Sequence, residues 1–432
     1  MGSNEISLVD ASDAMKIVAT VLFALAVVHT FMVKKFSSMS HKYRSGSIGE
    51  NFFHFLGEVE VVFGIWAAVF ISIWMAKFGS ASAVQFMESV NFTEAAFVFV
   101  VMCIAATKPI MTFTASLLDF LARLIPVKQA IGQYIVILTF GTLLGSVITE
   151  PAAMTVCAFL LKDKFFDRRI STRLKYATIG LLFVNISIGG TLTNFAAPPV
   201  LMVAGSWGWT TPFMFKTFGL PVIGAVVIST ILTVLFFYKE FLALPELKKI
   251  KHQDGNKIPL WMAATHLFFL GVTVYHSHHM AFFIPLFLLF LGWCAVTEEY
   301  QSQLRLRESL LVAFFLGGLV TLGKLQGWWL QPLIEQLGDL VLFSGAIALT
   351  AVTDNAALTY LGTLVPGLSD TAKYYLVAGA VTGGGLTVIA NAPNPAGYGI
   401  LQKSFGEDGI NPLGLLLGAI PYTIVAALMF LI

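Results

Sequence analysis

The sequence predicts an all-α polytopic membrane protein built from two inverted-topology repeats. First, 57% of the 432 residues are hydrophobic and only 12% are charged, whereas roughly 25% of a typical soluble domain is charged. Second, apolar runs of about 17–22 residues recur along the chain, and each is long enough to cross a ~30 Å hydrocarbon core. Third, similar motifs interrupt the apolar segments in the two halves of the chain.

The interruptions form two matched pairs. Residues 149–155 read TEPAAMT and residues 353–359 read TDNAALT, so both have a threonine and a carboxylate shortly before an Ala-Ala pair. Residues 189–199 (GGTLTNFAAPP) match residues 383–395 (GGGLTVIANAPNP). Paired interruptions of hydrophobic segments in two halves of a chain indicate the binding site of a secondary transporter.

Each half of the chain is expected to contain the same series of elements. The first repeat, residues 1–238, has three spans, a re-entrant helical hairpin, a discontinuous helix and a closing span, at 14–33, 56–76, 94–114, 130–161, 174–205 and 217–238. A cytoplasmic linker follows at residues 239–258. The second repeat, residues 259–432, has the corresponding elements at 259–275, 280–296, 308–323, 338–365, 374–401 and 413–432.

The distribution of lysine and arginine predicts the orientation of the chain. If both ends of each hairpin lie on one side of the membrane, 21 of the 26 basic residues fall in loops on a single face. Because basic loops stay in the cytoplasm, we expect the first hairpin to open to the cytoplasm and both termini to lie outside. No basic segment precedes the first apolar run, so we expect that run to be a retained helix. The basic loops are 34–50, 108–128, 162–175, 239–257, 298–308 and 402–411.

Two carboxylates, Glu150 and Asp354, lie at the interruptions of the predicted hairpins. Ionisable residues inside a membrane are unfavourable and usually mark ion pathways or proton relays. A broken helix exposes carbonyl groups, and these oxygens with a carboxylate suit a hard cation such as sodium. Burial favours the protonated carboxyl group, so the same acids could carry protons. The expected neutral ligands are Thr149, Thr353, Asn355, Thr193, Asn194, Thr387 and Asn391.

The same residues also have structural interpretations. Glu150 and Asp354 would cap half-helices at the breaks, and the small polar side chains would form hydrogen bonds between helices. Asn394 is open to both interpretations in the same way. Because acids recur at both breaks, capping alone does not account for them, and we expect an ion-binding role.

Other polar groups lie in the first half of the chain. His54, Glu58 and Glu60 are candidates for proton entry or sensing at the start of the second span. His54 and Glu58 are four residues apart and would pair on one helix face; an interfacial ion pair without a transport role is the alternative. Glu94 is expected to be a first-turn acid at a helix N-terminus.

The remaining features argue against several other classes of protein. His276, His278 and His279 form a cluster, but no neighbouring acid or cysteine completes a transition-metal site. The three cysteines lie singly in apolar sequence and indicate no disulfide framework. Because no nucleotide-binding loop, nucleophile elbow or HExxH motif is present, we expect neither an ATP-driven pump nor an enzyme, no cofactor and no nucleic-acid partner.

Several of these segments resemble the putative sodium/proton antiporter family of the ion-transporter superfamily. They are 52–64 (FFHFLGEVEVVFG), 148–155 (ITEPAAMT), 189–202 (GGTLTNFAAPPVLM), 353–362 (TDNAALTYLG) and 384–397 (GGLTVIANAPNPAG). The resemblance implies a homodimer with a scaffold part and an elevator-like transport part, with the ion held at the hairpin tips and broken helices. Related dicarboxylate carriers have Ser-Asn-Thr at these tips, where this chain has Thr-Glu-Pro and Thr-Asp-Asn.

The residues and the resemblance together predict a secondary antiporter of the plasma (bacterial inner) membrane that exchanges a monovalent cation, sodium above all, for protons. Protonation of Glu150 or Asp354 would remove the charge that holds the cation, so we expect Asp354→Asn to abolish exchange. A sodium-coupled carrier of an organic anion such as a dicarboxylate is the alternative. A passive channel is disfavoured because buried acids at re-entrant hairpins suit an occluded site.

Overall fold

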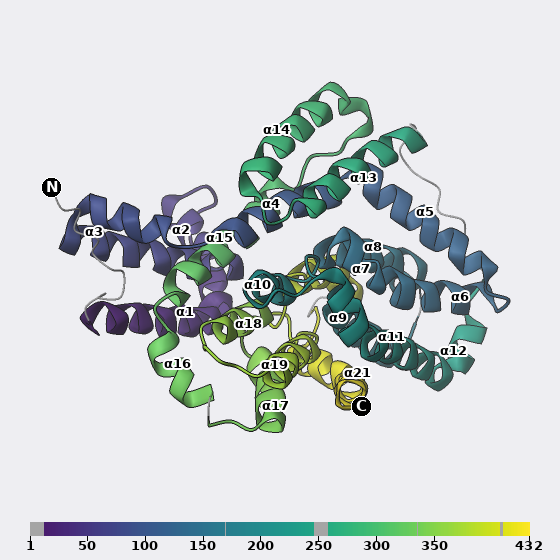
Figure 1. Cartoon of the computed structure of the whole chain (residues 1–432). Helices are drawn as coiled ribbons and strands as arrows, with labels where there is room; N and C mark the ends of the chain where they lie inside the picture. Colours follow the sequence, from purple (N-terminus) through teal and green to yellow (C-terminus); the bar gives the residue numbers. More distant parts are fainter. Residues whose placement is uncertain (1–12, 169, 246–257, 335, 407–408) are drawn as a thin grey trace. The chain divides into compact units, whose positions relative to one another are not determined.

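The computed structural model describes residues 13–168, 170–245, 258–334, 336–406 and 409–432. Within these ranges the chain is 80% helical and contains no β-strand, as predicted for an all-α protein. The chain divides into two compact units, and each unit takes segments from both halves of the sequence. Figure 1 shows the helices coloured along the chain.

Unit 1 comprises Met1–Phe99, Arg307–Leu337 and Tyr360–Leu368. Phe23, Phe63 and Phe315 form an edge-to-face chain through its core, with ring centroids 5.2 and 5.1 Å apart. Helix α1 packs against α2 and α3. The helices of this unit are α1 (Asp13–Ser40), α2 (Ile48–Leu56), α3 (Val62–Glu88), α15 (Leu306–Gly323) and α16 (Gly327–Ile334).

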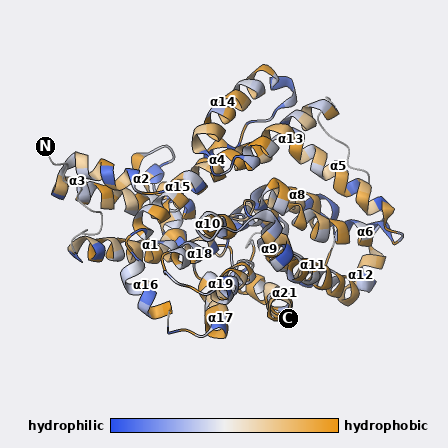
Figure 2. Cartoon of the chain, in the orientation of Figure 1, coloured by the Kyte–Doolittle hydropathy of each residue, from blue (hydrophilic) through white to orange (hydrophobic). Residues whose placement is uncertain are grey.

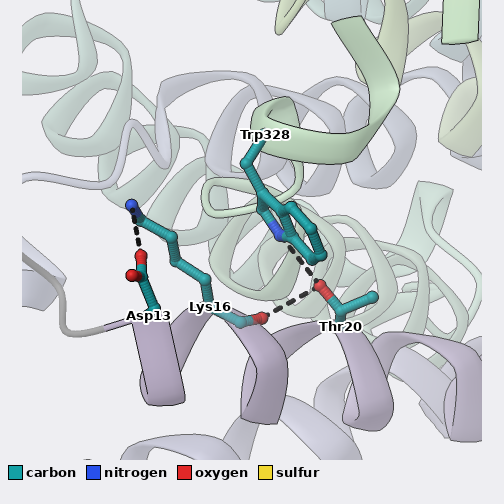
Figure 3. A network of polar contacts seen from close by, with 4 residues as sticks. All are labelled: Asp13, Lys16, Thr20 and Trp328. Atoms are coloured by element: carbon teal, nitrogen blue, oxygen red, sulfur yellow. Dashed lines mark hydrogen bonds and ion pairs between the residues drawn. The ribbon is translucent and has the colours of Figure 1, made fainter. Parts of the chain in front are cut away.

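A small polar network joins α1 to α16 within unit 1 (Figure 3). Trp328 Nε1 donates a hydrogen bond to Thr20 Oγ1 at 3.3 Å, and the Thr20 hydroxyl donates to the carbonyl of Lys16 at 2.9 Å. Lys16 Nζ in turn lies 3.3 Å from Asp13 Oδ1. The indole N–H of Trp328 thereby has a hydrogen-bond partner, while the residue is 52% exposed.

Unit 2 comprises Val100–Leu306, Gly338–Thr359 and Ser369–Ile432. Helices α4 (Thr93–Ala105) and α18 (Asn355–Thr363) pass from one unit into the other. From the first half of the chain it takes α5 (Lys108–Leu124), α6 (Gln129–Val136), α7 (Gly145–Ile148), α8 (Glu150–Leu161), α9 (Thr172–Gly189), α10 (Pro198–Trp207), α11 (Thr211–Phe236) and α12 (Tyr238–Ala243). From the second half it takes α13 (Leu260–Tyr275), α14 (Met280–Val296), α17 (Asp339–Thr350), α19 (Asp370–Gly383), α20 (Asn394–Leu401) and α21 (Pro412–Leu431).

Helix α9 lies at the centre of unit 2. It packs against α11 and α21, while α17 packs against α19. In its 18-residue apolar stretch 83% of the residues are buried, as expected of a helix whose apolar residues are not confined to one face. Contact with α21 is close because both helices present glycine, and a Cβ atom added at Gly180 would lie 2.4 Å from the backbone of Gly418.

Six helices in the described residues are long and apolar enough to cross a membrane, and a bent pair, α4 with α5, would make seven. Figure 2 shows hydrophobic residues along the length of these helices. Large apolar side chains are exposed on them, including Leu220 at 79% and Phe236 at 82%. These features are those of a multi-pass membrane protein. The six are Asp13–Ser40, Val59–Glu88, Thr172–Leu192, Thr211–Phe236, Leu306–Gly323 and Pro412–Leu431.

The predicted span at 94–114 is not one straight helix, because it contains a sharp bend. Helix α4 ends at Ala105, α5 begins at Lys108, and the two helices are bent by 66° relative to one another. Pro109 explains the break, because proline lacks an N–H group and its ring clashes with the carbonyl four residues earlier in a continuous helix. The predicted basic loop at 108–128 is therefore mostly the helix α5, which continues to Leu124.

Helices also extend into other segments that we expected to be loops. In 34–50, α1 continues to Ser40 and α2 begins at Ile48. Helix α3 is interrupted at Gly79 (φ 84°), three residues beyond the predicted end of the second span at residue 76, and a further helical segment continues to Glu88. The linker at 239–258 begins within α12, and residues 246–257 of it lie outside the described residues. Hydropathy marks where a segment leaves the hydrocarbon, whereas backbone hydrogen bonding continues until a cap or a proline ends it.

Candidate functional site

All four interruptions that the sequence predicts are breaks between helices of unit 2. The first separates α7 from α8 at Thr149, whose φ of 77° makes it the only non-glycine residue with positive φ among the described residues. Residues 351–354 separate α17 from α18, residues 193–197 follow the short helix η5 (Gly190–Leu192), and residues 384–393 separate α19 from α20. A strained non-glycine backbone of this kind is often part of a functional site.

The segment on either side of Thr149 folds back on itself. Cys157 Sγ of α8 lies 3.4 Å from the carbonyl oxygen of Ile137, in a short π-helix (η3, Ile137–Gly141) that precedes α7. A Cβ atom added at Gly145 would lie 3.4 Å from the Cβ of Ala153. The residues before Thr149 (η3 and α7) therefore pack against the residues after it (α8).

Side-chain hydrogen bonds join the two breaks within each half of the chain. Ser146 Oγ donates to the carbonyl of Gly189 at 2.6 Å and accepts from Leu192 N at 2.9 Å, while Thr193 Oγ1 donates to the Ser146 carbonyl at 2.7 Å. In the second half, Thr387 Oγ1 donates to the carbonyl of Ala351 at 2.9 Å. The free carbonyls of the breaks are thus partly satisfied by side chains, as buried backbone groups require.

Each half of the chain has the same backbone hydrogen bond, made by the first residue of the helix that follows the break. Glu150 N donates to the carbonyl of Ala196 at 3.4 Å, and Asn355 N donates to the carbonyl of Ala390 at 3.1 Å. A Cβ atom at Gly190 would lie 2.4 Å from Glu150 Oε1, and one at Gly384 would lie 2.8 Å from Asn355 Nδ2. The structural counterpart of Glu150 is therefore Asn355.

This correspondence corrects the pairing of Glu150 with Asp354 that the sequence motifs indicate. Asp354 precedes α18 and occupies the position that Thr149 has before α8. Asp354 Oδ1 accepts hydrogen bonds from Ala356 N at 2.8 Å and Ala357 N at 3.2 Å, which is the geometry of a helix N-cap. It lies close enough to Glu150 for the two carboxylates to interact electrostatically.

Glu150 is fully buried and has a polar partner from the other half of the chain. Asn391 Nδ2, in the break before α20, donates to Glu150 Oε2 at 2.9 Å. Glu150 Oε1 is a buried atom with no hydrogen-bond partner among the described residues. A buried carboxylate normally has its oxygens paired, so the second oxygen is available to a ligand.

Other buried oxygens around the breaks are unpaired within the described part of the chain. They belong to Thr149, Asn355, Asn391 and Asn394, and two more belong to Thr350 and Thr382 at the ends of α17 and α19. Asn394 itself donates to the carbonyls of Gly384 and Thr387 at 2.7 and 2.8 Å, which leaves its Oδ1 unpaired. Carboxylate and neutral oxygens are the ligands of hard cations.

Two of the predicted ligands are engaged elsewhere. Asn194 Nδ2 donates to the carbonyl of Trp209 at 3.1 Å, and its Oδ1 accepts from Thr211 Oγ1 at 2.7 Å. Thr353 Oγ1 donates to the carbonyl of Leu349, one turn earlier, at 2.8 Å. Among the described residues the cluster therefore consists of Glu150, Thr149, Asn355 and Asn391, with the hydroxyls of Thr193 and Thr387 bracing the breaks.

Sequence reasoning missed the bracing role of Ser146 and the close approach of Gly190 to Glu150. Ser146 lies in an apolar run and nothing in its local sequence distinguishes it. Gly190 belongs to the Gly-Gly motif that marks the interruption, but only the folded structure places Glu150 against it. Both residues act through contacts between segments that are about forty residues apart.

The candidates for proton entry lie in unit 1. His54 Nδ1 and Arg307 Nη2 both approach Glu58 Oε1, at 3.7 and 3.1 Å, so the predicted pairing is confirmed and Arg307 is an additional partner. Helix α2 ends at Leu56, so the pair lies across a helix end rather than along one face. Glu60 follows in a short 3-10 helix, Val59–Val61. The exposure of the pair favours the interfacial interpretation.

The contacts of Glu94 and of the histidine cluster are of a structural kind, namely a hydrogen bond at a helix start and ring packing. Glu94 lies in the first turn of α4, as predicted, and accepts from Asn91 Nδ2 at 3.1 Å. The ring of His276, just after α13, packs on Phe282 with ring centroids 3.9 Å apart. In the described part of the chain, His276, His278 and His279 included, no group of three or more His, Cys, Asp or Glu residues is arranged to hold a metal ion.

The helices and the site together define a multi-pass α-helical membrane protein whose broken helices carry, within the described ranges, buried, unpaired oxygens. Among the described residues at these breaks, Glu150 is the one fully buried carboxylate. A model of the putative Na+/H+ antiporter family matches residues 14–432, and the chain belongs to this family. The match confirms the family predicted from the sequence motifs. The family is one of transporters, and it supports exchange of a cation for protons. No curated protein matches the chain.

Proposed function

We propose that the protein exchanges sodium for protons by alternating access and that Glu150 holds each ion in turn. The observation that carries this proposal is a fully buried carboxylate with one hydrogen-bond donor, Asn391, and one oxygen that has no partner among the described residues. Membership of the family supports cation/proton exchange in general. The geometry favours Glu150 over Asp354 as the carrier because Asp354 caps α18.

Coupling follows from competition for the same carboxylate. In its ionised form Glu150 binds the cation together with the unpaired oxygens of Thr149, Asn355 and Asn391. Protonation removes the negative charge, and the cation then loses its principal electrostatic partner. A site that is loaded with either ion, but not with both, gives exchange when it faces the two sides of the membrane alternately.

The single carboxylate also sets the proposed stoichiometry. Asn355 occupies the position equivalent to Glu150 but cannot ionise. Sodium and a proton each carry one positive charge, so the loaded site has the same net charge in both forms. We therefore expect one sodium ion to exchange for one proton, and the exchange to be insensitive to membrane potential.

Alternating access is proposed from the paired breaks. Segments 130–161 and 338–365 act as re-entrant hairpins, and 174–205 and 374–401 act as discontinuous helices of two inverted repeats. The matching contacts Glu150–Ala196 and Asn355–Ala390 support this arrangement because they give the two halves the same local geometry. The homodimer, the elevator-like movement, and the orientation with cytoplasmic basic loops and external termini belong to the same proposal.

Purified protein in vesicles that enclose a pH-sensitive dye tests the function directly. Added sodium should move protons in wild-type vesicles, and Glu150→Gln, which is close in shape but cannot ionise, should abolish this movement. Glu94→Gln serves as the matched control, since Glu94 lies in another unit at a helix start. Normal exchange by Glu150→Gln would refute the assignment. Sodium-dependent dicarboxylate uptake without proton movement would instead support the organic-anion carrier.

A further inference from the structure

A groove in unit 2 lies between α9, α11 and α21, away from the four breaks. Its volume is about 530 Å³, and most of its lining side chains are apolar, among them Leu232, Leu417 and Val425. Phe236 and Leu417 at its edge are 82% and 60% exposed. These helices are among those long and apolar enough to cross a membrane. The groove therefore opens towards the part of the surface that lipid chains cover.

The two ends of the groove differ in polarity. Helices α9 and α21 begin, and α11 ends, at the same end of the groove, where Arg173, Phe237 and Gly414 line it. From there the lining continues along α21 to Val425, a distance of about 16 Å at 1.5 Å per residue. That length is roughly the depth of one leaflet of a ~30 Å hydrocarbon core.

Arg173 supplies charge at the polar end. Its side chain is exposed and makes no hydrogen bond or ion pair with any residue in the described ranges. Nearby charges are already engaged: Glu240 accepts from Ser171 Oγ at 2.9 Å, and Lys175 Nζ donates to the carbonyl of Ser404 at 2.6 Å. Of these groups, only the guanidinium of Arg173 is left free to bind an anion.

Tyrosine and threonine side chains form the floor of the groove and hold its helices together. Thr233 Oγ1 of α11 donates to the hydroxyl of Tyr422 of α21 at 2.8 Å. Asn411 N, just before α21, donates to the hydroxyl of Tyr176 of α9 at 3.0 Å. With these polar groups satisfied, the interior of the groove presents apolar surface to a ligand and charge only at its rim.

We propose that this groove binds an anionic phospholipid, with the phosphate at Arg173 and an acyl chain along α21 towards Val425. The charge at one end, the apolar interior and the length of one leaflet match such a molecule and not a soluble anion. Basic pockets between membrane helices on the cytoplasmic side bind anionic head groups. The sequence predicts that side for residues 162–175, which carry six of the basic residues.

The test compares lipid classes on the full-length protein. Wild type is purified from membranes containing phosphatidylcholine alone or with phosphatidylglycerol, and retained lipid is counted by native mass spectrometry. We expect phosphatidylglycerol to be retained preferentially. Arg173→Gln should lower that preference about five-fold, the factor that one basic side chain near an anionic surface supplies. Arg123→Gln, which removes another exposed arginine of the same unit outside the groove, should have no effect.

A second variant examines the acyl chain. Val425→Phe fills the inner end of the groove and should lower retention of both lipids without changing the preference between them. Equal retention of the two lipids by wild type, or equal behaviour of Arg173→Gln and Arg123→Gln, would overturn the proposal. Displacement of phosphatidylglycerol by inorganic phosphate would also overturn it, because the site would then bind a free anion.

Discussion

The bond between Asn391 and Glu150 allows the sharpest test of the site. Asn391 Nδ2 lies 2.9 Å from Glu150 Oε2, and it is the only hydrogen-bond donor to that carboxylate among the described residues. Asn391→Ala would leave the ionised carboxylate buried without a donor. A hydrogen bond to a charged group contributes roughly 1.5–3 kcal/mol, and about 1.4 kcal/mol corresponds to a factor of ten. We therefore expect sodium to bind roughly 10–150-fold more weakly at fixed pH.

The assay is the sodium concentration that gives half-maximal proton movement in vesicles held at one pH. Asn194→Ala provides the control, because Asn194 lies at the other Gly-Gly interruption but contacts Trp209 and Thr211 instead of the cluster. Thermal unfolding of both variants shows whether either change acts through stability. A change of less than three-fold for Asn391→Ala, or equal effects of the two variants, would refute the reasoning about Glu150.

Three further predictions follow from the geometry of the breaks. Asp354→Asn should retain exchange with only a few-fold loss of sodium affinity, because asparagine also caps a helix; complete loss would restore Asp354 as a carrier, as the sequence predicted. Asn355→Asp adds a carboxylate at the position equivalent to Glu150. Reversal-potential measurements should then show exchange of more than one proton per sodium ion, which depends on the membrane potential. An unchanged proton-to-sodium ratio would contradict the correspondence between Glu150 and Asn355. Gly190→Ala places a Cβ atom 2.4 Å from Glu150 Oε1 and should lower the exchange rate at least about ten-fold, at a cost of ~1–3 kcal/mol in folding stability. Gly399→Ala is the control, because nothing lies within 4 Å of its new Cβ atom, and it should leave exchange unchanged. Equal exchange rates for the two variants would count against the contact between Gly190 and Glu150.

The sequence predicted the helical class, the family and the four breaks because each depends on local chemistry. Long apolar runs require helices in a membrane, and glycine or proline beside polar residues in such a run weakens the helix at that point. The bend before Pro109 carries a local signal as well. It was missed because the hydropathy of the surrounding residues continues through it.

Which groups meet at the site was decided by the tertiary structure. The matched motifs align Glu150 with Asp354. The backbone hydrogen bonds instead place Glu150 and Asn355 at equivalent positions, because α8 begins at Glu150 and α18 begins one residue after Asp354. A shift of one residue in a helix start is invisible in a motif alignment, but it decides which side chain points into the protein.

The sequence by itself determined where the helices can break and which acids accompany the breaks. The bond from Asn391 to Glu150 joins residues 241 positions apart, and the contact of Arg307 with Glu58 spans 249 positions. Contacts at such separations depend on how the helices pack, and packing depends on the shapes of all the contacting surfaces together. Only the folded chain could therefore show that Glu150 is held by the other half of the protein.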